Sequence, residues 1–133
     1  MTTELYWLTL TLLMTALFWL PYILNRIMVR GLIPAITGTK PETTDDQSEW
    51  AQRAIRAHMN AVENLAVMAP AVLIAHALKI STPGTETAVM VYFFARLVHY
   101  LVYTAGIPVV RTLAYAVGWV STMAVVLAIL GWM

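Results

Sequence analysis

Two long stretches of the sequence contain no charged residue. Leu5–Leu24 covers 20 residues and Thr112–Met133 covers 22. A helix needs about 20 predominantly apolar residues to cross the hydrocarbon core of a bilayer, which is roughly 30 Å thick. Of the 133 residues, 60% are hydrophobic and 11% are charged, and a soluble domain of this size could not bury so much apolar surface. The chain is therefore predicted to fold in a membrane.

Two further spans lie between these runs and carry polar residues. Leu65–Leu78 has only 14 uncharged residues, too few to cross a bilayer at about 1.5 Å per residue, so the second span must include the charged segment before it. The third span contains Arg96 and His99. We expect an all-α integral membrane protein, a single four-helix domain over residues 1–133 with spans at about 5–28, 48–79, 83–104 and 109–132.

The lysines and arginines near the span ends predict the orientation, because cytoplasmic loops carry an excess of these residues. Arg26, Arg30 and Lys40 lie beside or within the first loop, whereas the other face has only Lys79. We therefore expect the first and third loops on the cytoplasmic side and both termini on the opposite side. The N-terminus lacks the basic residues of a cleaved signal, so the first span is expected to be retained.

Helical rise brings the polar residues of three helices into one layer. Counted from the outer ends of their spans, Glu63 lies about 24 Å and Arg96 about 20 Å deep, both in the cytoplasmic half. The polar residues of each helix recur at helical spacing, so each set forms one stripe. The stripes are Arg53, Arg56, Asn60 and Glu63; Arg96, His99 and Tyr103; and Arg111 and Tyr115.

The three stripes contain four arginines and one carboxylate, that of Glu63, an excess of about three positive charges. An ionisable residue at membrane depth is costly and normally turns toward a partner or a cavity. The excess therefore predicts a bound small anion. We expect no metal, and a net charge of +1 gives no reason to expect nucleic acid as a partner. Since the chain has no cysteine, any thiol chemistry must use the thiol of a substrate.

Other interpretations of these residues remain open. Arg96 and Glu63 could form a structural ion pair that fixes helix register without any ligand. Arg26, Arg30 and Arg53 could extend their charged ends to the membrane surface. A small multidrug transporter is a further alternative, but such exporters depend on a carboxylate in the first span. Leu5–Leu24 contains none, and arginines around Glu63 would repel a cationic drug.

Two segments resemble a known family. The segment QRAIRAHMNAVEN, residues 52–64, resembles the signature of the MAPEG family, the membrane-associated proteins of eicosanoid and glutathione metabolism. The segment ARLVHYLVYTAGIPVVRTLAY, residues 95–115, is similar to the region where the third and fourth helices of that family meet. Gln52 stands where the family often has Glu, and Met59 where some members have Arg. The resemblance covers the whole chain and is greatest to bacterial members related to microsomal glutathione transferases.

This resemblance implies a homotrimer in a bacterial inner membrane, with glutathione bound as co-substrate between subunits near the cytoplasmic face. The activity it implies is transfer of glutathione to a lipophilic electrophile, or reduction of a lipid hydroperoxide. By position, Arg111 would stabilise the thiolate and Tyr115 would act one helical turn further on. The glutathione-binding residues carried over by position are Arg53, Arg56, Asn60, Glu63, Arg96, His99 and Tyr103. The alternative is a non-catalytic scaffold or lipid-binding protein of the same family.

Overall fold

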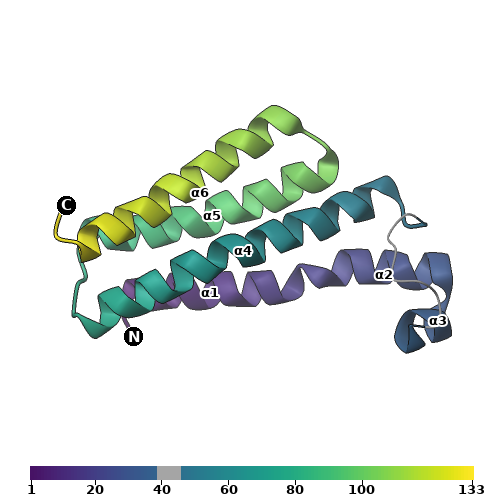
Figure 1. Ribbon diagram of the computed structural model, residues 1–133, viewed down its shortest axis with the longest axis horizontal. Coiled ribbons are helices and arrows are strands. Elements are labelled where there is room, and N and C mark those ends of the chain that lie inside the picture. The colour runs from purple at the N-terminus through teal and green to yellow at the C-terminus, as the bar shows by residue number, and fades with distance from the viewer. Residues whose placement is uncertain (39–45) are drawn as a thin grey trace.

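The computed structural model describes residues 1–38 and 46–133, and within these residues the chain forms six helices and no strand (Figure 1). Four helical stretches are long and apolar enough to cross a membrane: α1 with α2, then α4, α5 and α6. The expectation of an all-α chain with four such helices is therefore confirmed. The helix bounds are α1 Thr3–Leu17, α2 Trp19–Arg30, α3 Leu32–Thr37, α4 Glu49–Ala77, α5 Pro83–Ala105 and α6 Pro108–Ile129.

The first candidate span, Thr3–Arg30, consists of two helices that meet at Phe18. The regular helix stops at Leu17 and resumes at Trp19, with Phe18 between them. Pro21 lacks an N–H and cannot donate to the carbonyl of Leu17, which weakens the helix at this point. The hydroxyl of Tyr100 on α5 donates to the carbonyl of Phe18 at 2.9 Å, and the two rings stack with centroids 3.9 Å apart. The break is thus held against α5.

The predicted first loop contains the short helix α3 (Leu32–Thr37), which the sequence analysis missed. Six residues between two glycines are too few to show a helical hydrophobic period, so the pattern gave no signal. Lys40, which contributed to the predicted orientation, lies in residues 39–45, outside the described residues.

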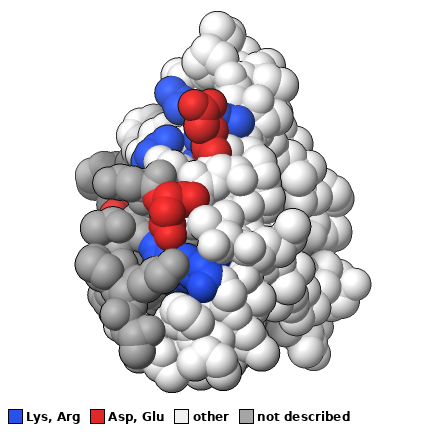
Figure 2. Space-filling model, turned by 90° about the vertical axis from the view of Figure 1, so that its right-hand side faces the viewer, with Lys and Arg blue, Asp and Glu red and all other residues white. Residues whose placement is uncertain are grey.

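The ends of α2 and α4 are joined by polar contacts. Arg30 donates to both carboxylate oxygens of Asp46, at 2.8 and 2.9 Å, and Arg26 donates to the side-chain carbonyl of Gln47 at 3.1 Å. Both arginines therefore have partners within the chain. Charged side chains gather at this end of the molecule (Figure 2).

Small residues on α4 allow the helices to pack closely. The face that α4 buries contains six alanines, and small side chains let helix backbones approach one another in membranes. These residues are Ala51, Ala54, Ala57, Ala61, Ala71 and Ala75. α5 packs most extensively against α6 and also contacts α1 and α4. Both termini lie at one end of the molecule, while the start of α4 and the α5–α6 turn lie at the other (Figure 1). This topology places the three predicted polar stripes toward the same end.

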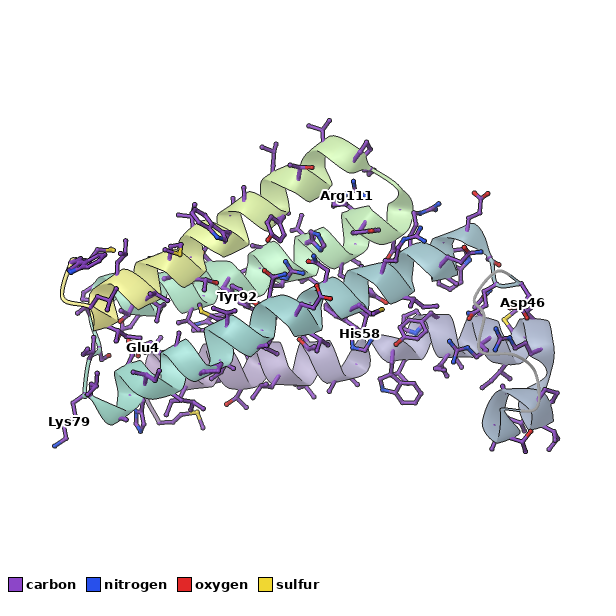
Figure 3. The ribbon with its side chains drawn as sticks, in the orientation of Figure 1. Glu4, Asp46, His58, Lys79, Tyr92 and Arg111 are labelled. Carbon is purple, nitrogen blue, oxygen red and sulfur yellow. The ribbon has the colours of Figure 1, made fainter. Side chains whose placement is uncertain are left out.

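A buried carboxylate joins α1 to the start of α5 at the end that holds the termini (Figure 3). Glu4 is 5% exposed and accepts hydrogen bonds from two hydroxyls. Ser81 donates to both of its oxygens, at 2.9 and 3.1 Å, and Thr85 donates to one at 2.6 Å. These contacts satisfy the carboxylate and fix the two helix ends to each other.

Candidate functional site

A cavity of about 290 Å³ lies where α4, α5 and α6 meet, toward the α5–α6 turn. Five of the nine residues predicted for the site line it, and so does Thr112, which the sequence analysis missed. Thr112 follows Arg111 and precedes Tyr115 by three positions, a helical spacing that could have indicated it. The lining residues are Asn60, His99, Tyr103, Arg111, Thr112 and Tyr115.

Aromatic contacts hold the cationic side of this cavity. The guanidinium carbon of Arg111 lies 4.6 Å from the centre of the Tyr103 ring, a cation–π distance. The His99 ring lies 5.5 Å from Tyr103 and 6.3 Å from Tyr115, between centroids. Figure 3 shows Arg111 near the α5–α6 turn, on the side where α6 faces α5. The two helices joined by this turn thus present one cation and three rings to the same space.

Arg96 lies behind the cavity wall rather than on it. Its side chain is 2% exposed, and it is not among the lining residues. Its Nη2 donates to Oδ1 of Asn60 at 2.6 Å and lies 3.4 Å from Nδ1 of His99. Asn64, which sequence reasoning also missed, donates to the same Asn60 oxygen at 3.2 Å. Arg96 therefore contacts two residues of the cavity wall, Asn60 on α4 and His99 on α5.

Arg53 contacts the C-terminal end of α5 instead of the cavity. Its Nε donates to the carbonyl of Thr104 at 2.9 Å, which satisfies one of the carbonyls left free at a helix end. Gly106 follows with φ +80°, and a Cβ built there would lie 3.4 Å from the Arg53 guanidinium. Arg53 thus packs over the turn that leads into α6.

Arg56 and Glu63 are exposed on the surface of the single chain. The sequence left open an ion pair between Glu63 and Arg96, and the structure does not form it. Among the described residues, the ion pair that forms joins Arg30 and Asp46. Neither Arg56 nor Glu63 has an ion-pair partner in the part of the chain that the structure describes.

The chemistry of the lining favours an anion. Amide, imidazole, phenol, hydroxyl and guanidinium groups line the cavity, and no carboxylate is among them. The described residues contain no group of three or more His, Cys, Asp or Glu side chains that could hold a metal ion. The cavity can therefore receive an acceptor-rich, negatively charged group by hydrogen bonds and by the charge of Arg111.

Comparison with known proteins agrees with this combination of fold and site. Neither a curated protein nor a solved structure matched the chain. The sequence model of the MAPEG family matches residues 6–131, nearly the whole chain. That family includes glutathione transferases and related enzymes, and its members are associated with glutathione. With four helices long and apolar enough to cross a membrane, this chain is an integral membrane protein of the MAPEG family.

Proposed function

We propose that this protein is a membrane-embedded, glutathione-dependent transferase that also reduces hydroperoxides. The observation that carries the proposal is the cavity between α4, α5 and α6, whose wall combines Arg111 with amide, imidazole and phenol groups and contains no carboxylate. A thiolate and a carboxylate are both anionic acceptors, and glutathione carries one thiol and two carboxylates. The membership of the MAPEG family makes glutathione the first candidate among anionic thiols.

The remaining predicted residues supply the rest of the binding site in this proposal. Arginine holds a carboxylate through two charge-assisted hydrogen bonds. Arg56 is exposed and can make such contacts, and Arg53 can make them with the N–H groups that do not bind Thr104. The exposed carboxylate of Glu63 receives the ammonium group of glutathione. Arg111 and Tyr115 act on the sulfur.

The protein is proposed to work as a homotrimer with glutathione between subunits. A cavity of about 290 Å³ lies at the lower end of the roughly 300–1,000 Å³ typical of small-molecule sites. Arg56 and Glu63 lie outside it, on an exposed face of α4. A neighbouring subunit covering this face would enclose the ligand and would remove the Glu63 charge from contact with lipid.

The chemistry begins with ionisation of the thiol. A free thiol with a pKa near 8.5 is mostly protonated at pH 7, and a nearby guanidinium favours the thiolate. In the transferase reaction the sulfur forms a bond to an electrophilic carbon, and the leaving group departs with the electron pair. In the peroxidase reaction the sulfur attacks the outer oxygen of a hydroperoxide, an alcohol leaves, and a second glutathione yields the disulfide and water. Tyr103 or Tyr115 donates a proton to the leaving group.

The site is proposed to face the cytoplasm from a bacterial inner membrane. Arg26 and Arg30 lie at the same end of the molecule as the cavity, and basic residues are enriched on the cytoplasmic side. Glutathione then enters from water, and the lipophilic electrophile or lipid hydroperoxide enters from the bilayer.

The test is ultraviolet absorbance of the purified protein on addition of glutathione, followed by turnover with a panel of electrophiles and hydroperoxides. We expect a thiolate band at neutral pH and turnover of at least one lipophilic substrate. Binding with a thiolate band but no turnover across the panel would favour the non-catalytic scaffold or lipid-binding protein. Absence of both, together with transport of a cationic drug in vesicles, would favour the transporter.

A further inference from the structure

Arg96 has the position of a group that orients other side chains. It is 2% exposed, and its aliphatic part packs against Gly118 of α6. A Cβ at Gly118 would lie 3.6 Å from the Arg96 Cδ. Its Nε has no hydrogen-bond partner within the described residues, and neither has the nearby buried hydroxyl of Tyr92. A buried arginine without a carboxylate partner is unfavourable for stability alone, since its desolvation is only partly offset. Its contacts with Asn60 and His99 therefore point to a role at the cavity.

The first contact fixes the direction of the Asn60 amide. Arginine has donors and no acceptor, so the Asn60 atom 2.6 Å from its Nη2 must be the carbonyl Oδ1. Asn64 donates to the same oxygen at 3.2 Å and to the Asn60 backbone carbonyl at 2.8 Å. Both lone pairs of Oδ1 are thus engaged. The Nδ2 group, for which no described residue is an acceptor, is left as the Asn60 group that can bind a ligand in the cavity.

The second contact favours one tautomer of His99. Its Nδ1 faces an N–H of Arg96 at 3.4 Å and must accept, because the arginine cannot. A neutral imidazole that accepts at Nδ1 carries its proton on Nε2. No described residue is bonded to Nε2, and His99 lines the cavity. His99 therefore also presents a donor to the ligand.

We infer that Arg96 is a positioning residue that makes the Asn60 and His99 side of the cavity donate only, and that it thereby selects an anionic sulfur or carboxylate over a neutral group. This inference deepens the proposed function and rests on it for the identity of the ligand. It also assigns the ammonium group of glutathione elsewhere, because Asn60 has no free acceptor to offer it. The carboxylate of Glu63 remains the acceptor for that group.

One test needs no ligand. Nitrogen-15 NMR of the purified full chain, labelled at its histidines, reports which ring nitrogen of His99 carries the proton. The His99→Asn variant assigns the signal, because it lacks only that histidine. We expect a neutral ring protonated at Nε2, and a mixture of tautomers in Arg96→Met. Protonation at Nδ1 in the parent protein, or an unchanged tautomer in the variant, would overturn the positioning role whether or not glutathione binds.

The second test measures selectivity with two glutathione derivatives, the sulfonate as an anionic probe and S-methylglutathione as a neutral one. We expect the parent to prefer the sulfonate by at least about tenfold. Asn60→Asp keeps an acceptor for Arg96 but removes the Nδ2 donors, and Arg96→Met removes the donors that orient Asn60 and His99. Both should lose most of this preference, whereas the charge-matched control Arg26→Met should keep it.

Full preference in Arg96→Met would show that Asn60 and His99 keep their orientation without Arg96 and would overturn the inference. Failure of the parent to bind either derivative would instead refute the proposed function, and the tautomer measurement would still decide the role of Arg96. Thermal unfolding of each variant separates a loss of selectivity from a loss of fold.

Discussion

Replacing Arg111 with alanine tests the proposed chemistry most directly. In the proposed mechanism the Arg111 guanidinium stabilises the thiolate of glutathione, while the carboxylate contacts come from other residues. The variant should therefore still bind glutathione but hold it with the thiol protonated at neutral pH. The expected result is a higher pKa of the bound thiol and slower turnover.

The size of the effect follows from the position of Arg111. Its guanidinium lies 4.6 Å from the Tyr103 ring centre, and its side chain is half-buried at the cavity wall. Two unit charges about 4 Å apart interact by about 1 kcal/mol in bulk water and about 4 kcal/mol near a protein surface. One pKa unit corresponds to about 1.4 kcal/mol, so the thiol pKa should rise by roughly one to three units. The fraction of thiolate at pH 7 then falls by about tenfold or more.

The assay is a pH titration of thiolate absorbance in the bound state, with turnover and glutathione affinity measured on the same samples. Arg111→Lys should recover part of the effect, because it keeps the charge but not the planar fork. Arg26→Ala removes a charge at the same end of the molecule, outside the proposed site, and serves as the control. If both Arg111 variants titrate and turn over like the parent, the arginine only extends to the membrane surface and plays no part in the chemistry.

Three further predictions concern assembly and stability. Native mass spectrometry in mild detergent should show trimers, and Glu63→Ala should weaken both the trimer and glutathione affinity because Glu63 is the proposed acceptor for the ammonium group at the subunit boundary; a monomeric parent would refute this. Glu4→Leu removes the hydrogen bonds that Ser81 and Thr85 donate to the carboxylate and should cost about 1.5–3 kcal/mol in total, seen as a lower melting temperature, whereas Glu4→Gln should cost less. Gly106→Ala places a side chain at φ +80° and should destabilise the protein by about 1–2 kcal/mol, so an unchanged melting temperature would contradict the assignment of that turn.

Much of the fold could be predicted because the membrane restricts the choices. A long uncharged run must be a helix there, and helical rise alone then sets the depth of each polar residue. This reasoning placed Asn60, His99 and Arg111 in one layer, and the structure brings all three to the wall of one cavity. The depth of a residue in a membrane helix depends only on the length of the span and the direction in which it runs.

Local departures from regular helix were harder to predict. Pro21 is a sequence signal for the break at Phe18, but a proline within a membrane helix often leaves the helix continuous. The hydrogen bond from Tyr100 to the Phe18 carbonyl joins two helices and cannot be predicted from the sequence around Phe18. The same holds for the turn at Gly106, where the position of Arg53 could not be read from either segment alone.

Arg96 shows where counting charges along the sequence stops being informative. Charge alone would pair Arg96 with Glu63. Glu63 lies three residues after Asn60 on α4, however, and this spacing turns its side chain by about 60° away from that of Asn60. α5 packs beside α4 on the side of Asn60, so the amide receives the Arg96 hydrogen bond and Glu63 turns to the exposed face. A polar stripe on a helix is therefore wide enough to serve two surfaces. In this chain one half of the stripe meets α5, and the other half, with Arg56 and Glu63, lies on the exposed face of α4 that the proposed neighbouring subunit would cover.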